Sequence, residues 1–412
     1  MMISRAYKTQ LDPTPAQVQA FILQSDVTRF VFNWALGKRQ EHYKETGKQL
    51  SAVELIKEFR AVRKVRDDLA WTAEASSRAE ESALRRLDAA YKNFFEKRTK
   101  FPRFKRWRDG IVPFSYWSLK PEHVQERAIR LQGIGWVRLQ EAGYLPQAGA
   151  KINSATVSER IGKWFVSLQV EEEVADTVPT GETLGVDAGV SRLATVSDGR
   201  VYEAPKALYA VERKLAHLQR KLCRQVKGSA GREETKARIA KLHYRIANLR
   251  KSMIHEASAD ILSRHGEAQD QPERVGVEGL NVKGMMANHC LAKAVGDASM
   301  GELLRQIGYK AAWQGTAVVT ADQWFPSSST CSRCGWKVAE LSLGQRVFRC
   351  AQCGLEVDRD YNAAVNLAKL AQEQGESENA GGGRIGVAVG SRPARPAPKR
   401  NAGSTIAAGV GG

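Results

Sequence analysis

The chain has 412 residues, and its 63 Lys and Arg against 45 Asp and Glu give a net charge of +18 and a pI near 9.7. A hydrophobic fraction of 42% and a charged fraction of 26% exclude a wholly disordered chain. No apolar run is long enough to span a membrane, and the first residues lack a signal core. We therefore expect a cytoplasmic, nucleoid-associated protein of several domains whose partner is a polyanion, most often nucleic acid.

The N-terminal region has a helical pattern from Thr14 to Lys97. Thr14, Pro15 and Gln17 are typical of a helix start, because the hydroxyl and the returning Gln side chain satisfy free backbone amides. Apolar residues then recur at spacings of three and four. The preceding segment, residues 5–11, is predicted to be a strand that joins a later β module.

A β-rich module is predicted for the next region, up to about residue 175. Pro102 ends the helical pattern, and residues 101–108 place four cations among three aromatic side chains. Short alternating runs then predict strands. These runs cover residues 128–131, 135–139, 152–157 and 164–170.

An α/β region begins near Glu182. Three strands are predicted at 184–190, 192–196 and 200–204, with a tight turn at Asp198–Gly199. Residues 206–251 then carry Leu and Ile at spacings of three and four, which predict an antiparallel seam of two helices. This segment holds 14 Lys or Arg against 3 Glu, a net charge of +11. Such a surface favours contact with phosphates, although a solvated helix pair remains the alternative.

The remaining elements alternate between strands and helices. Strands are predicted at 275–280 and 316–320, and helices at 301–313 and from 358 to about 373. Beyond Gly375 the sequence is rich in Gly, Ala, Pro and Arg, and we expect that tail to be disordered.

Four cysteines have the spacing of a metal site. Cys331 and Cys334 form one pair and Cys350 and Cys353 form another, with a glycine after each pair. Each pair is expected to fold into a knuckle, and the two together would make a tetrahedral tetrathiolate site that suits Zn²⁺. A closed shell of four ligands leaves no open position, so one structural zinc ion is predicted. The other two cysteines, Cys223 and Cys290, are interpreted as ordinary thiols.

Three acids on separate elements are candidates for a second metal site. Asp187 lies within an apolar strand, Glu278 at a strand end and Asp360 at a helix start. Asp358 or Asp360 alone could be a helix cap, but a carboxylate in an apolar strand is costly unless a cation lies against it. The order of elements matches an RNase H-like sheet, in which three carboxylates meet at one edge. Carboxylate oxygens suit Mg²⁺ or Mn²⁺, and two such ions can activate a water and stabilise the leaving oxygen of a phosphodiester.

The sequence resembles the TnpB (OrfB) family of transposon-encoded RNA-guided DNA endonucleases, which are related to compact type V CRISPR effectors. The matching segments run in order from about residue 5 to residue 372. They are residues 7–39, 90–95 and 102–105, the stretches around Asp187 and Glu278, and residues 325–331 and 358–364.

The resemblance implies an α+β multidomain fold with an RNase H-like (RuvC) nuclease domain. It implies that Asp187, Glu278 and Asp360 are catalytic and hold two Mg²⁺ (or Mn²⁺) ions, with Asp187 bridging both. The second acid of the motif is the usual ligand, which favours Asp360 over Asp358. The implied domains are a first wedge strand (1–13), a helical recognition domain (14–100), a barrel-like wedge module (101–180), RuvC-like segments with a basic hairpin at 206–255 (181–324), a zinc ribbon (325–356), a third RuvC-like segment (357–374) and a tail (375–412).

The implied function is cleavage of target DNA that is selected by a transposon-derived guide RNA and a flanking DNA motif, in support of transposon maintenance. The partners would be an omega-type guide RNA and double-stranded DNA, with no membrane, and the protein would be a monomer in the RNA complex. The predicted nucleic-acid contacts are Arg103, Lys105, Arg106, Arg108, Lys214, Arg220, Lys221, Arg224 and Lys227. The alternatives are a transposase that acts directly on transposon ends, a nuclease-inactive RNA-guided repressor and a small accessory CRISPR effector.

Overall fold

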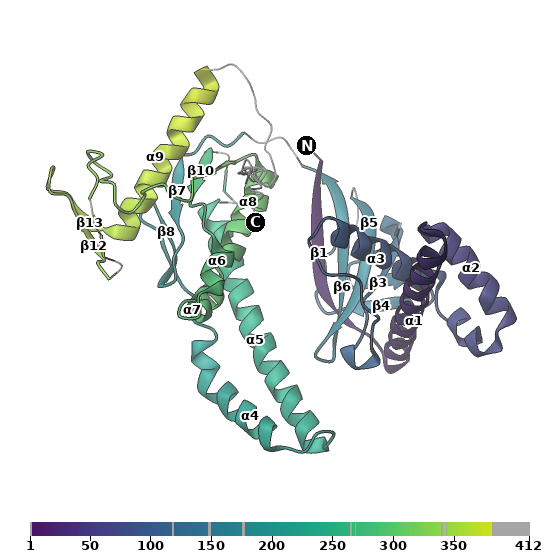
Figure 1. Cartoon of the computed structure of the whole chain (residues 1–412). Helices are drawn as coiled ribbons and strands as arrows, with labels where there is room; N and C mark the ends of the chain where they lie inside the picture. Colours follow the sequence, from purple (N-terminus) through teal and green to yellow (C-terminus); the bar gives the residue numbers. More distant parts are fainter. Residues whose placement is uncertain are drawn as a thin grey trace, which may run out of the picture. The chain divides into compact units, whose positions relative to one another are not determined.

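The structure is a computed structural model that describes residues 2–117, 119–146, 150–174, 178–263, 266–267, 269–338, 341–342 and 344–380 (Figure 1). The chain divides into two compact units, each described here by itself. The first comprises Met1–Thr177 and Pro205–Ile254, and the second Val178–Ala204 and His255–Gly412. Within the described part of the chain, no helix has the length and apolar character needed to cross a membrane.

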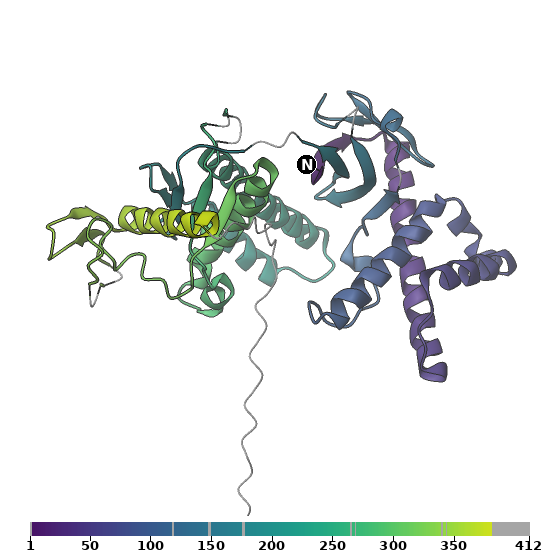
Figure 2. The ribbon, with the colours of Figure 1, turned by 90° about the horizontal axis from the view of Figure 1, so that it is seen from above.

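The first unit contains three long helices beside a sheet (Figure 2). They are α1 (Pro15–Thr46), α2 (Ala52–Val65) and α3 (Ser77–Phe95). The predicted helix start is confirmed, because the Thr14 hydroxyl accepts the Gln17 amide and the Gln17 side chain accepts the Thr14 amide. The middle of α1 packs against α2 and α3 in one apolar core. This core includes Val27, Val31, Phe32, Leu55, Phe59, Leu84 and Leu87.

The sheet of the first unit has six antiparallel strands in the order β2-β5-β6-β1-β4-β3. The strands are β1 (Met2–Asp12), β2 (Phe114–Trp117), β3 (Ala128–Leu131), β4 (Gly135–Leu139), β5 (Lys151–Arg160) and β6 (Lys163–Glu173). The segment predicted to join this module forms β1, which pairs with β6 through ten registered residue pairs. The sequence prediction missed β2, a strand of only four residues that pairs with β5.

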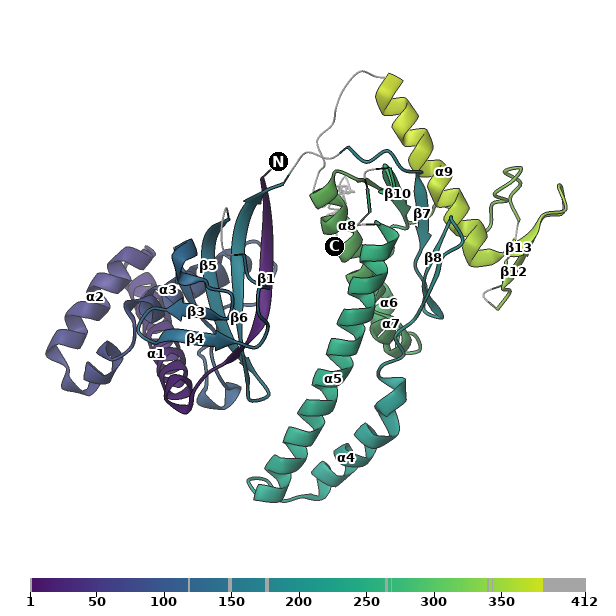
Figure 3. The same cartoon turned by 180° about the vertical axis from the view of Figure 1, so that it is seen from behind.

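The basic segment forms two antiparallel helices, as the sequence predicted. They are α4 (Glu212–Arg224) and α5 (Ala230–Ile261), which are joined by a short turn and lie at an angle to each other (Figures 1 and 3). Leu215, Leu218 and Ile246, which were predicted to lie in the seam, are buried, whereas Leu249 is 45% exposed. Arg232 donates hydrogen bonds to the carbonyls of Leu222 and Gln225, which ties the start of α5 to the end of α4. Residues 205–254 also group with the first unit and not with the predicted nuclease segments.

The second unit is built on a five-stranded sheet of order β11-β10-β7-β8-β9. Its strands are β7 (Leu184–Asp187), β8 (Arg192–Val196), β9 (Val201–Glu203), β10 (Arg274–Val277) and β11 (Ala317–Thr320). β10 lies parallel to both β7 and β11, and β8 lies antiparallel to β7 and β9. Helices α6 (Val282–Ala287), α7 (Ala292–Ala298), α8 (Met300–Gln314) and α9 (Arg359–Ala380) complete the unit.

Helix α9 extends farther than the sequence predicted. It continues through Gly375 to Ala380, so the expectation of a disordered tail is wrong for residues 375–380. Residues 376–380 contain neither proline nor glycine, which permits the helix to propagate. The rest of the predicted tail, residues 381–412, lies outside the described residues.

Two paired glycines allow α9 to lie directly on the sheet. Gly185 of β7 and Gly276 of β10 are register partners in the parallel ladder. A Cβ atom at Gly185 would collide with the Ala364 carbonyl of α9, and one at Gly276 would collide with the Leu367 carbonyl. Only glycine leaves room for the helix backbone at these two positions.

We expect Gly185→Ala to lower the melting temperature of the second unit by about 10 °C, because overpacking of this kind costs about 3 kcal/mol. The matched control is Gly308→Ala on α8, where an added Cβ meets no atom within 4 Å, and its melting temperature should not fall. Thermal unfolding followed by circular dichroism measures both. Equal melting temperatures for the two variants would contradict the close packing of α9.

Candidate functional site

The sheet register places Asp187 and Glu278 beside each other. Val186 of β7 pairs with Val277 of β10 in a parallel ladder, and each acid is the next residue along its strand. Neighbouring strands lie about 4.8 Å apart, and residues two apart on a strand share a face. Asp187 and Glu278 therefore lie on the face of Gly185 and Gly276, which is the face that α9 covers.

Helix α9 brings the third acid to the same edge. Ala364 of α9 lies against Gly185, and Asp360 precedes Ala364 by about one helical turn. Asp187 follows Gly185 by two residues of extended chain. The helix start and the strand end thus meet, and three elements far apart in sequence converge there.

The hydrogen bonds distinguish Asp358 from Asp360. Asp358 Oδ1 accepts the backbone N–H groups of Asp360 and Tyr361, at 2.9 and 3.1 Å, which makes Asp358 the N-terminal cap of α9. Its other oxygen accepts from Arg192 at 2.8 Å. Asp360 makes only long ion pairs in the described residues, with Arg192 at 3.9 Å and Arg346 at 4.0 Å. This arrangement leaves Asp360 as the acid with free coordination capacity.

The electrostatics of Asp187 reflect this convergence. Burial, followed by the charges of Glu278 and Asp360, raises the pKa of the Asp187 carboxyl well above its ordinary value, and Arg359 partly opposes the shift. The three carboxylates are thus close enough to repel one another. Among the described residues, however, only the four cysteines are gathered tightly enough to be a ready metal-binding group.

The residues around Asp187 fit a hard divalent cation. All the candidate donors are carboxylate oxygens, which Mg²⁺ and Mn²⁺ prefer. Thr195 is the registered partner of Asp187 on β8, so its side chain lies on the same face. The Thr195 hydroxyl is buried and has no hydrogen-bond partner among the described residues. A hydrated cation beside Asp187 would supply that partner.

The four predicted cysteines come together. Their sulfur atoms all lie within 4.8 Å of one another, with Cys331 paired to Cys353 at 3.7 Å and Cys334 to Cys350 at 3.6 Å. Gly335 and Gly354 adopt φ angles of +75° and +69°, which explains the glycine after each pair. The described residues thus contain a cysteine cluster able to hold a metal ion.

The cysteine cluster is continuous with the acidic site. Strands β12 (Val347–Arg349) and β13 (Glu356–Asp358) form a two-stranded ribbon with a small core around the buried Phe348. β13 ends at Asp358, and α9 begins at the next residue. The fold of this ribbon therefore determines where α9 starts.

The nine predicted nucleic-acid contacts are all exposed. The segment around Arg103 and Lys105 is held against α1 in an extended form. The Asn33 side chain bonds both backbone groups of Lys105, at 2.7 and 2.9 Å, and Arg29 lies over the Trp107 ring at 4.7 Å. These contacts fix the backbone. Lys105 Nζ lies over the Phe32 ring at 5.2 Å, while the Arg103, Arg106 and Arg108 side chains are exposed to solvent.

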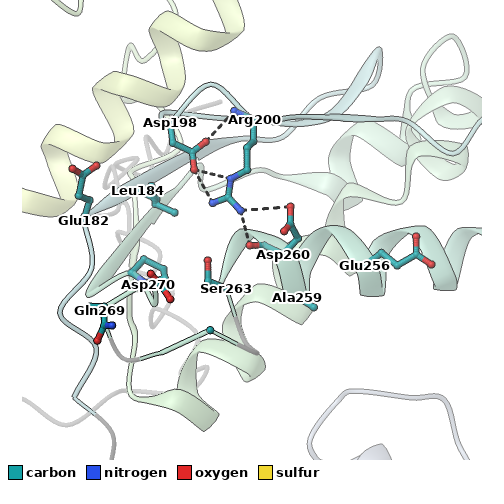
Figure 4. Close-up of a pocket in the computed structure, with 12 residues that line it drawn as sticks. Glu182, Leu184, Asp198, Arg200, Glu256, Ala259, Asp260, Ser263, Gln269 and Asp270 are labelled. Carbon is teal, nitrogen blue, oxygen red and sulfur yellow. Dashed lines mark hydrogen bonds and ion pairs between the residues drawn. The ribbon is translucent and has the colours of Figure 1, made fainter.

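A pocket of about 910 Å³ in the second unit does not contain the three acids. It is lined by five acidic side chains and by Arg200, whose guanidinium is held by Asp198 and Asp260 (Figure 4). The excess of negative charge repels phosphate, so this pocket is unsuited to a phosphodiester. The sequence-predicted site is an open sheet edge and not the large cavity.

Comparison with known proteins gives the family. Residues 156–289 match a family described as "Probable transposase" (OrfB), and residues 301–367 match "Cas12f1-like, TNB domain". A "Putative RNA-guided DNA endonuclease" of Streptomyces pristinaespiralis is 33% identical over 372 residues, covering 89% of each chain. The chain belongs to the TnpB (OrfB) family. A second member, InsQ of Escherichia coli K12, is 32% identical and covers 88% of this chain and 91% of its own.

A solved structure supports the TnpB fold. The Cas12f1 chain of a Cas12f1–sgRNA–target DNA complex aligns with a TM-score of 0.55 and 13% identity, covering 89% of this chain and 99% of that chain. A helix-turn-helix family also matches residues 1–48, which in this TnpB protein fold as β1 and α1.

Sequence reasoning missed three side chains at the TnpB site. Arg192 pairs with Asp358, Thr195 lies opposite Asp187, and the Ser327 hydroxyl donates to Glu278 at 2.6 Å. Arg192 and Ser327 are remote in sequence from their partners, so no local pattern indicates these contacts, whereas Thr195 lies on the strand next to Asp187 and only the register of that hairpin identifies it. Ser327 lies within one of the segments that carried the family resemblance, but the sequence assigned it no role.

Proposed function

We propose that this TnpB-family chain is an RNA-guided DNA endonuclease. The observation that carries the proposal is the convergence of Asp187, Glu278 and Asp360 from β7, β10 and α9 at one sheet edge. The strand order, with two parallel partners on one side of β7 and an antiparallel pair on the other, supports an RNase H-like (RuvC) domain. The names of the relatives describe the same activity.

The three acids are the proposed ligands of two Mg²⁺ or Mn²⁺ ions, with Asp187 shared and Glu278 and Asp360 holding one ion each. Such ions, when bound, lower the pKa of an attacking water and stabilise the leaving oxygen of a phosphodiester. The chain itself fixes the acids on rigid elements, and Arg192 and Arg346 place positive charge beside them. This charge would attract and orient the scissile phosphate.

The cysteine cluster is the proposed site of one structural Zn²⁺. Four thiolates close the tetrahedral shell, so the ion has no position for substrate. Its role would be to fold residues 325–356, whose own core is small, and thereby to fix the start of α9.

The exposed cations of residues 103–108 and 214–227 are the proposed contacts with the phosphates of an omega-type guide RNA and its DNA duplex. Such contacts position nucleic acid without reading bases. Sequence selection would then come from guide pairing, with the protein reading only a short flanking motif. Residues 14–100 and 101–180 are the proposed recognition and wedge domains.

The test is to isolate the full chain from its native host with its RNA, sequence that RNA, and incubate the complex with plasmids that carry the matching target beside a randomised flank. We expect cutting only of matched plasmids, only with Mg²⁺ or Mn²⁺, and only beside one flanking motif. The controls are RNA-free protein, EDTA and a mismatched guide. Joined transposon ends without RNA would support a direct transposase, and matched binding without cutting would support a repressor; either result would contradict the proposal.

A further inference from the structure

A serine that precedes the cysteine cluster contacts the acid at the end of β10. The Ser327 hydroxyl donates to Glu278 Oε1 at 2.6 Å, and Ser327 is 3% exposed. Ser327 belongs to residues 321–330, which connect β11 to Cys331. This bond occupies one carboxylate oxygen of Glu278 and leaves Oε2 with its coordination capacity.

Two asparagines of α9 hold this connecting segment in place. Asn366 Nδ2 donates to the carbonyls of Ser327 and Thr330, at 2.8 and 2.7 Å. Asn362 Nδ2 also donates to Thr330, at 2.7 Å, and Asn362 Oδ1 accepts the Ser332 amide at 2.9 Å. The two residues are one helical turn apart on the same face, and both are buried. The helix that carries Asp360 therefore also fixes the segment that contacts Glu278.

These contacts differ from ordinary packing because their geometry is directional. A buried carbonyl that loses its donor is costly, so Asn362 and Asn366 strongly favour one position of residues 327–332. That position begins the first cysteine knuckle, in which the Cys331 amide donates to the Trp336 carbonyl at 2.7 Å. One continuous network thus links the cysteine cluster, α9 and the Glu278 carboxylate.

We propose that Ser327 is a positioning residue that sets the rotamer of Glu278 for metal binding, and that Asn362 and Asn366 make this position depend on the folded ribbon. The inference rests on the proposed function, since it takes Glu278 to be a metal ligand. When a residue that hydrogen-bonds to a metal ligand is mutated, the metal affinity typically falls by about 10–100-fold. A freely rotating Glu278 would have to be ordered when the ion binds, which weakens binding.

The experiment compares Ser327→Ala with Ser327→Thr in the full chain. The probe is Mn²⁺, and its binding is followed by the electron paramagnetic resonance of the free ion. The site is defined as the Mn²⁺ binding that Asp187→Asn removes. We expect Ser327→Ala to weaken this binding about 10-fold and Ser327→Thr, which keeps the hydroxyl, to restore it to within about threefold. The matched control is Ser328→Ala, because the Ser328 hydroxyl makes no hydrogen bond among the described residues.

The dependence of cleavage on the Mn²⁺ concentration is a second measurement, and it distinguishes a positioning role from a merely structural one. In Ser327→Ala the Mn²⁺ concentration for half-maximal cleavage should rise about 10-fold, while the rate at saturating Mn²⁺ stays within about threefold of wild type. Asn366→Ala should produce the same shift, and its melting temperature identifies any variant that fails to fold.

Unchanged Mn²⁺ binding in Ser327→Ala, or no restoration by Ser327→Thr, would overturn the positioning role. Failure of the proposed nuclease function would give a different result from failure of the positioning role. In that case the wild-type complex would not cut matched DNA, while the Mn²⁺ binding could still depend on Ser327.

Discussion

Asp187→Asn is expected to lower the rate of target cleavage by about 10³-fold and to leave the affinity for guide RNA and target DNA unchanged. The amide has the same size as the carboxylate, but it lacks the negative charge that a ligand shared by two cations must supply. Single-turnover cleavage of a matched plasmid measures the first effect, and gel-shift binding of RNA and DNA measures the second.

The same substitution should increase the stability of the folded protein when no cation is bound. Because burial and its acidic neighbours raise the pKa of Asp187, the charged carboxylate disfavours the folded state at neutral pH when no cation is bound. In EDTA, Asp187→Asn should therefore melt at a higher temperature than wild type, and added Mg²⁺ should raise the melting temperature of wild type only.

The matched control for this prediction is Asp358→Asn. Asp358 caps α9 and pairs with Arg192; Asn keeps the cap but loses the charge that pairs with Arg192, so this variant should lose less than about 1 kcal/mol of stability and preserve cleavage at saturating Mg²⁺. Undiminished cutting by Asp187→Asn, or loss of cutting in Asp358→Asn with activity retained in Asp360→Asn, would refute the assignment of the acids.

Cys350→Ser is expected to abolish metal retention by the ribbon and, with it, target cleavage. Folding of a structural zinc site is coupled to metal binding, with apparent free energies of about 10–16 kcal/mol. The small core around Phe348 cannot replace that stabilisation. Elemental analysis should find one zinc ion per wild-type chain and none in the variant.

Cys223→Ser is the matched control, because Cys223 is exposed and lies outside the cluster. It should retain both zinc and activity. A zinc-free Cys350→Ser variant that cuts at the wild-type rate would show that the ribbon is dispensable for the nuclease site.

Local patterns predicted the local features of this fold. The Thr14 and Gln17 capping box requires only four residues, and β3, β4 and β8 occupy the predicted residues. The cysteine cluster followed from spacing alone, since only two short pairs had to meet.

Features that depend on distant partners were not predictable. The strand β2 has only four residues and forms by pairing with β5, which follows much later in the chain. The need for glycine at 185 and 276 appears only when α9 lies against them. Likewise, Ser327 and Glu278 are 49 residues apart, and tertiary structure alone brings them together.

The most direct test of the account is the anomalous diffraction of Mn²⁺ in crystals of the protein with its guide RNA and a matched DNA target. We predict two manganese peaks about 4 Å apart, both contacted by Asp187, with Glu278 on one and Asp360 on the other. Manganese bound elsewhere, or these three carboxylates held more than about 10 Å apart in that complex, would contradict the proposed nuclease site.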